Sequence, residues 1–144
     1  MAYVLEYDKN KLLSDIVSGE CNESDLQSHL NEANVSGFLK DADLRGVDFS
    51  GISLRGYKLF RANLEGANLK GVNLRRSDLR KSNLKEANLE EANLYRANMR
   101  HSNLTRANLK SAYLREADLH RANLTSAYLN GADLNKTNLL KAIL

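Results

Sequence analysis

From residue 39 to residue 144, apolar and polar positions recur with a period of five residues. Leucine occupies almost every fifth position up to Leu144, and the two residues that replace it, Phe49 and Met99, are also apolar. A small residue, most often alanine, precedes each leucine by two positions, and Asn or Asp usually stands between them, as in Ala62-Asn63-Leu64. Each unit of five therefore offers two inward positions and three outward ones.

A period of five fits neither an α-helix nor a continuous strand. Five residues advance about 500° around a helix, so the leucines would not share one face. Along a strand, an odd period would place successive leucines on opposite sides. The pattern works if three extended residues (small residue in, Asn or Asp out, leucine in) are followed by a two-residue corner. Six of the eight glycines stand second in a corner, where a positive φ is often needed: Gly46, Gly51, Gly56, Gly66, Gly71 and Gly131.

Four corners near a right angle close a square coil of 20 residues, and leucines 20 residues apart then stack, for example Leu64 on Leu84. The 21 units that end at Leu44 through Leu144 give about five coils, and a coil spacing of about 4.8 Å makes the body about 25 Å long. Tyr57 replaces a small residue, which predicts either a wider first coil or a Tyr57 side chain that points toward the N-terminal segment. We therefore predict an all-β, four-sided parallel β-helix over residues 41–144.

The first 40 residues lack the repeat and predict a mainly helical N-terminal cap, separate from the repeat domain of residues 41–144. Residues 1–7 are β-prone and are expected to form a short edge strand or to lie over the body. A first helix is expected between Asp8, as its N-cap, and Gly19. A second is expected to start at Ser24 or Asp25 and to end at Ser36-Gly37. The expected inward residues at helical spacing are Leu12, Leu13, Ile16 and Val17, then Leu26, Leu30 and Ala33.

The repeated motif A-[D/N]-L-x-x, seen in Ala42-Asp43-Leu44 and Ala87-Asn88-Leu89, resembles the pentapeptide repeat family over residues 42–144. The resemblance implies a right-handed, four-sided parallel β-helix. The family includes DNA mimics that bind type II topoisomerases, and a resemblance to those members would imply an acidic, rod-like dimer. The repeat of this chain is basic and uninterrupted, so it departs from the DNA mimics.

No pattern of catalytic, cofactor-binding or metal-binding residues stands out, so we expect a protein that is not an enzyme and that needs no cofactor. The recurring Asp and Asn residues are of the type that bonds to backbone near turns. His101 and His120 are expected to be neighbours on adjacent coils, which leaves a metal site open. A single cysteine (Cys21), no signal-like N-terminus and no run that could span a bilayer indicate a cytoplasmic protein.

The net charge of +3 hides an uneven distribution. Residues 1–41 carry eight acidic and three basic side chains (net −5), and the remainder carries 18 basic and 10 acidic ones (net +8). Unwrapping the square places most of the excess on two adjacent faces, with net charges of +4 and +5. These faces are either a solvated surface or a binding surface for an anionic partner. The candidate binding residues are Arg55, Arg61, Arg75, Arg76, Arg80, Lys81, Arg96, Arg100, His101, Arg115, Arg121, Lys136 and Lys141.

The last coil carries apolar residues at outward positions, which favours end-to-end homodimerisation. The candidate dimer end consists of Tyr128, Leu139, Leu140, Ile143 and Leu144. Taken together, the sequence predicts a non-enzymatic protein-binding or scaffold module that presents rigid faces to a macromolecular partner, most readily a protein. The alternative is an electrostatic binder of nucleic acid or another polyanion through the two basic faces. The sequence names neither the partner nor the biological process.

Overall fold

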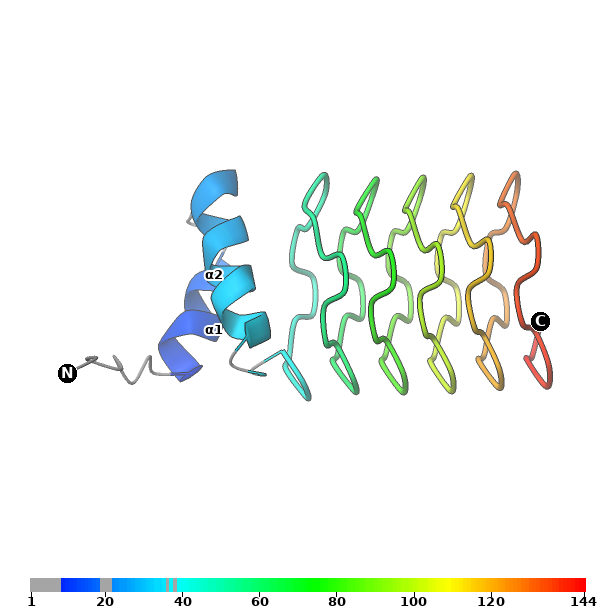
Figure 1. Cartoon of the computed structure of the whole chain (residues 1–144), viewed down its shortest axis with the longest axis horizontal. Helices are drawn as coiled ribbons and strands as arrows, with labels where there is room; N and C mark the ends of the chain where they lie inside the picture. The colour runs from blue at the N-terminus through cyan, green and yellow to red at the C-terminus, as the bar shows by residue number, and fades with distance from the viewer. Residues whose placement is uncertain (1–8, 19–21, 36, 38) are drawn as a thin grey trace.

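The computed structural model describes residues 9–18, 22–35, 37 and 39–144 (Figure 1). Helices α1 (Lys9–Ser18) and α2 (Glu23–Val35) pack against each other at one end of a straight stack of coils, and the C-terminus lies at the other end. None of the described helices is long and apolar enough to cross a membrane. Asp8, Gly19 and residues 1–7, for which the sequence made predictions, lie outside the described residues.

The coils repeat every 20 residues, as predicted. Parallel bridges join the middle residue of each extended triplet to the residue 20 positions later, from Asp43 with Asn63 to Asn123 with Ile143. In each bridge the leucine N–H donates to the next coil and the middle N–H donates to the previous one: Leu64 N bonds Asn83 O at 2.7 Å, and Asn83 N bonds Ala62 O at 3.0 Å. Three extended residues per side are too few for longer strands, so each of the four walls is a ladder of single bridges.

Every corner is a β-turn that is closed by a hydrogen bond back to the leucine, as in Ala87 N to Leu84 O at 3.1 Å. The second corner residue has a positive φ in all 21 corners, between 55° and 72°. The six corner glycines confirm the prediction made for them. The other fifteen residues at this position are not glycine, and they hold the same left-handed conformation. An L-residue in this region is strained, and the hydrogen bonds on both sides of the corner hold it there.

The core is a column of leucines and small residues, as the inward pattern predicts. Leu64, Leu84 and Leu104 are all fully buried, one above the other. Ser77, Ser82 and Ser102 replace alanine at inward positions, and each hydroxyl donates to a carbonyl three residues earlier at 2.7 Å. The substitution therefore leaves no buried hydroxyl unpaired.

The helical segment differs from the prediction in two details. The N-cap of α2 is Asn22 instead of Ser24 or Asp25: Asn22 Oδ1 accepts from Asp25 N at 3.0 Å, and the Asn22 amide donates to the Asp25 carboxylate at 2.7 Å. The first bond is an N-cap bond and the second joins the two side chains, so the helix starts at Glu23. Val17 is 44% exposed because the buried face of α1 centres on Ile16, which is fully buried. Leu30 is buried and Leu26 partly buried, as predicted.

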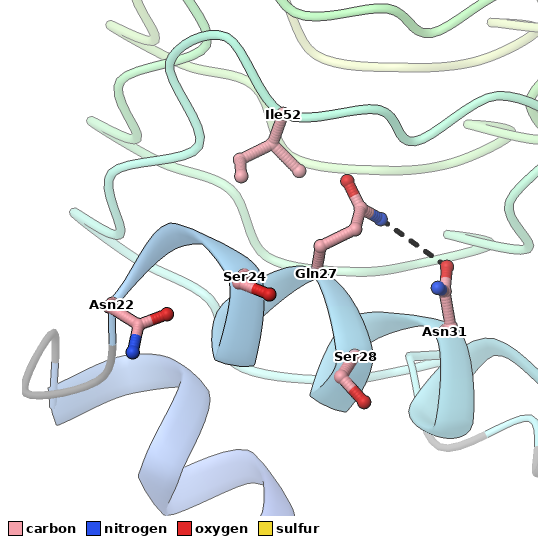
Figure 2. Close-up of a pocket in the computed structure, with 6 residues that line it drawn as sticks. All are labelled: Asn22, Ser24, Gln27, Ser28, Asn31 and Ile52. Atoms are coloured by element: carbon pink, nitrogen blue, oxygen red, sulfur yellow. Dashed lines mark hydrogen bonds between the residues drawn. The ribbon is translucent and has the colours of Figure 1, made fainter.

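Helix α2 covers the open edge of the first coil with side chains that replace a missing coil (Figure 2). Gln27 Oε1 accepts from Ser53 N at 3.0 Å, and Gln27 Nε2 donates to Ser53 O at 2.9 Å, which are the two bonds that a preceding coil would supply. Asn34 Oδ1 likewise accepts from Lys58 N at 2.9 Å. Tyr57 points toward α2, which confirms the second of its two predicted placements.

The Tyr57 hydroxyl anchors this contact. It donates to Asn31 Oδ1 and accepts from Gln27 Nε2 at 3.1 Å. Burial raises the pKa of the Tyr57 hydroxyl. The helices are thus joined to the coils by directed hydrogen bonds.

Candidate binding surface

All thirteen basic candidate residues lie at two neighbouring corners of the square. The third corner consists of residues 55–56 and their equivalents every 20 residues, and the fourth corner consists of residues 60–61 and their equivalents. Between them lies the fourth wall, whose outward residues are Lys58, Asp78, Asn98, Asp118 and Asn138. The sequence assigned the cations to two faces; the register places them at the two edges of one wall.

Five of the candidate cations are paired with carboxylates. Arg80 contacts Asp78 at 2.6 Å and Arg96 contacts Glu116 at 2.7 Å. The hydrogen bond from Arg80 holds the pKa of the Asp78 carboxyl below its usual value, and Arg96 does the same for Glu116. The other pairs are Arg61 with Asp41, Arg100 with Asp118 and Arg115 with Glu116. Exposed pairs of this kind contribute little to stability, so a partner can compete for these cations.

The remaining eight candidates form no ion pair with any residue that the structure describes. Four lie at the third corner and four at the fourth, so the positive potential extends along both edges. They are Arg55, Arg75, Arg76, Lys81, His101, Arg121, Lys136 and Lys141.

The third corner combines arginines with tyrosines. The guanidinium carbons of Arg75 and Arg96 lie 5.1 and 5.0 Å from the centroid of the Tyr95 ring. A shallow hollow beside Tyr95 is lined also by Tyr113, Arg115 and Asp133. Tyr113 is 56% exposed and is not among the candidates predicted from the sequence. The signal was present, because Tyr113 replaces the usual Asn or Asp at the outward position, as Tyr128 and Ile143 do.

At the fourth corner, His101 and His120 are neighbours on adjacent coils, as predicted. Their ring centroids are 6.0 Å apart in an edge-to-face arrangement, and His101 N donates to His120 O at 3.0 Å. Burial, with Arg100 and Arg121 nearby, lowers the pKa of His120. Within the described ranges, no group of three His, Cys, Asp or Glu side chains could hold a metal ion.

Nearer the helices, the fourth corner holds a second aromatic residue among cations. Phe60 is half-buried, and four cationic groups lie over its ring. Their distances to the ring centroid range from 5.4 Å for Arg80 to 5.9 Å for Lys81, with Lys40 and Arg61 between these values.

The candidate dimer end is exposed in the structure. Tyr128, Leu140 and Ile143 are each more than half exposed, Leu144 is 75% exposed, and Leu139 is half-buried. The last leucine whose N–H bonds to a later coil is Leu124, which donates to Ile143 O at 2.7 Å. Beyond it, Leu129, Leu134 and Leu139 are only partly buried.

The profile of the family described as pentapeptide repeats matches residues 39–76, 73–110 and 102–139, with eight copies. Among solved structures, the chain is similar to alr5209, a pentapeptide repeat protein from Nostoc Pcc 7120, with 24% identity, coverage of 77% of this chain and 93% of that chain, and a TM-score of 0.61. It is also similar to the pentapeptide repeat protein Rfr23 from the cyanobacterium Cyanothece 51142, with 26% identity, coverage of 78% and 98%, and a TM-score of 0.49.

A third similar structure is the plasmid-mediated fluoroquinolone resistance protein QnrB1, with 18% identity, coverage of 72% of this chain and 63% of that chain, and a TM-score of 0.50. A comparison with curated proteins gave no match. The fold is the right-handed, four-sided β-helix of these structures, as predicted. With three matched segments that together span residues 39–139, the chain belongs to the pentapeptide repeat family.

Proposed function

We propose that this protein is a non-enzymatic, cytoplasmic binding module that docks a protein partner through the third corner. The observation that carries the proposal is the hollow between Tyr95 and Tyr113, with Arg75 and Arg115 at its sides. Tyrosine and arginine are enriched in the centres of protein interfaces, where they bury large areas and form directed contacts. The backbone ladder holds these side chains on a rigid frame, so little ordering is needed on binding.

The charge of the corner defines the partner further. Arg55, Arg75, Arg76 and Lys136 have no ion pair among the described residues, so an acidic protein surface would find several uncompensated cations. The Nε atom of Arg75 is buried and has no hydrogen-bond partner in the described part of the chain. Leaving this N–H without a hydrogen bond costs free energy, and a partner carboxylate near the Arg75 guanidinium would offset part of that cost.

Binding of nucleic acid through the same cations is the alternative, and the distribution of charge favours protein. Asp78, Asp118 and Glu116 interrupt the basic corners and would repel the continuous charge of a phosphate backbone, whereas a protein surface can place its carboxylates beside the cations alone. The basic corners are also unlike the acidic surface of a DNA mimic, so we do not propose topoisomerase modulation.

The experiment is a pull-down from native cytoplasm with the immobilised full chain, compared with the double variant Tyr113→Ser with Arg115→Ser. The control is Lys110→Ser with Asn130→Ser, which changes two exposed residues at the corner formed by residues 50–51 and their equivalents. We expect the unmodified chain and the control variant to capture a partner protein that the Tyr113→Ser, Arg115→Ser variant does not capture. Equal capture by both variants would refute the proposed surface, and tight, salt-sensitive binding of duplex DNA or RNA at low salt would favour the alternative.

We further propose that two copies associate through the candidate dimer end, because its apolar side chains and partly buried leucines offer a self-complementary surface. Sedimentation velocity at low protein concentration tests this proposal. A dimer that Leu140→Ser with Ile143→Asn converts to monomer is the expected result, and a monomer in the unmodified chain contradicts it.

A further inference from the structure

A second hollow lies at the fourth corner, where the helical segment meets the coils. Its lining includes Lys40, Lys58, Phe60, Asp78 and Arg80. Phe60 replaces the polar or charged residue usual at this corner position, as Arg80 and Arg100 show one and two coils later. The Phe60 ring and the alkyl stems of the surrounding Lys and Arg side chains give the hollow an apolar floor with a charged rim.

The rim carries more positive charge than its carboxylates neutralise. Five cations surround the ring or line the hollow, and only Arg61 and Arg80 are paired, with Asp41 and Asp78. Lys40, Lys58 and Lys81 form no ion pair with any described residue, which leaves three positive charges uncompensated. Cations gathered around one ring repel one another, so an anion that joins them is stabilised.

The arrangement of the cations selects among anions. A nucleobase that stacks face-on needs the whole Phe60 ring and would displace the four cationic groups that lie over it, whereas a smaller aliphatic side chain needs only part of the ring. Asp78 also lines the hollow and would repel any anionic group beside it, so the anionic groups of a ligand belong on the lysines of the rim and an uncharged group belongs next to Asp78. An inorganic anion would use the rim and leave the apolar floor unused. An acidic peptide with an apolar side chain between carboxylates uses both.

We propose that the hollow beside Phe60 binds a short acidic segment of a protein, with one apolar side chain on the Phe60 floor and flanking carboxylates on Lys40, Lys58 and Lys81. This inference adds a peptide-recognition site to the proposed protein-binding function. It rests on the proposed function only because both assume that the partner is a protein. The site is separate from the Tyr95 hollow, because the two lie at different corners.

The test measures fluorescence anisotropy of a labelled, end-blocked peptide, Glu-Asp-Leu-Asp-Glu, with the purified full chain at low salt. We expect Phe60→Ser, and separately Lys40→Ser with Lys81→Ser, to weaken binding at least about tenfold. The charge-matched control, Lys70→Ser with Lys110→Ser, removes two exposed cations at a different corner of the square and should change the affinity less than about threefold. Replacing the peptide's Leu by Ser should weaken binding to the unmodified chain as much as Phe60→Ser does.

Several outcomes would overturn the proposal. They are equal weakening by the two lysine double variants, equal binding of the Leu and Ser peptides, or binding of a 15-nucleotide oligo-thymidine with no binding of the peptide. Each variant should fold, because all the substituted residues are exposed or half-buried, and a cooperative thermal melting transition checks this. The variant Tyr113→Ser with Arg115→Ser should leave peptide binding unchanged, so failure of this site and failure of the Tyr95 surface give different results.

Discussion

Replacing Glu91 by glycine should stabilise the protein, because Glu91 stands second in a corner with φ of 58°. The left-handed conformation costs a residue with a Cβ about 1–2 kcal/mol, and glycine avoids this cost. Glycine in turn loses about 0.5–1 kcal/mol through the greater freedom of the unfolded chain. The Glu91 side chain is exposed and forms no ion pair with a described residue, so little else changes. We expect a net gain of about 0.5–1 kcal/mol in the free energy of unfolding.

The assay is urea unfolding of the full chain followed by far-UV circular dichroism, where this gain raises the midpoint by about 0.3–0.5 M. Two controls separate the backbone effect from other changes. Glu91→Ala removes the same charge but keeps a Cβ in the strained conformation. Lys110→Gly changes the residue whose carbonyl accepts from Glu91 N at 2.9 Å and whose φ is not positive, so this variant should lose stability. The reasoning is refuted if Glu91→Gly is no more stable than Glu91→Ala, or if both glycine variants shift the midpoint in the same direction.

Three further predictions concern the core, the helix contact and acid stability. Leu84→Ala, in a fully buried position, should lower the free energy of unfolding by about 2–5 kcal/mol, whereas Leu134→Ala, in the partly buried final coil, should cost about 1 kcal/mol; urea midpoints that fall equally would contradict this. Tyr57→Phe removes the hydrogen bonds to Gln27 and Asn31 and should destabilise the contact by about 1–3 kcal/mol, seen as faster amide hydrogen exchange in α2, while Tyr113→Phe should leave that exchange unchanged. The pKa of Asp78 is lower in the folded chain than in the unfolded one. The stabilising contribution of the Asp78 carboxylate is therefore present above pH about 4 and is lost as the pH falls through the folded pKa. Asp78→Asn should reduce the drop in melting temperature between pH 5 and pH 3.

The inward half of the fold could be predicted because burial leaves few alternatives. Leucine every fifth residue with a small residue two positions earlier fits only a chain that turns once per unit, and the right-angle corners then set the 20-residue register. The same register predicts which residues share a wall. It could not distinguish the two placements of Tyr57, because that choice depends on hydrogen-bond partners in α2 that the repeat does not encode.

The outward half was predicted less completely, because outward positions are constrained weakly. The thirteen basic residues were identified, but the pairing of Arg61 with Asp41 or of Arg96 with Glu116 depends on side-chain geometry between coils. Tyr113 was not predicted as a candidate, although it interrupts the outward Asn and Asp pattern as Tyr128 does. The N-cap of α2 was misplaced by two or three residues because Asn22, Ser24 and Asp25 are all good capping residues, and only the reciprocal bonds select Asn22.

The 20-residue register has a consequence for insertions. An insertion of one five-residue unit leaves every inward position filled, so the core tolerates it, but all later outward residues move a quarter turn around the axis. A unit inserted between Arg80 and Arg100, for example, would move Arg100 and Arg121 away from the corner that they share with Arg80. Insertion of a full set of four units lengthens the rod and keeps every column aligned. Changes of length in steps of 20 residues therefore preserve the surface pattern, whereas single-unit changes redistribute it without unfolding the protein.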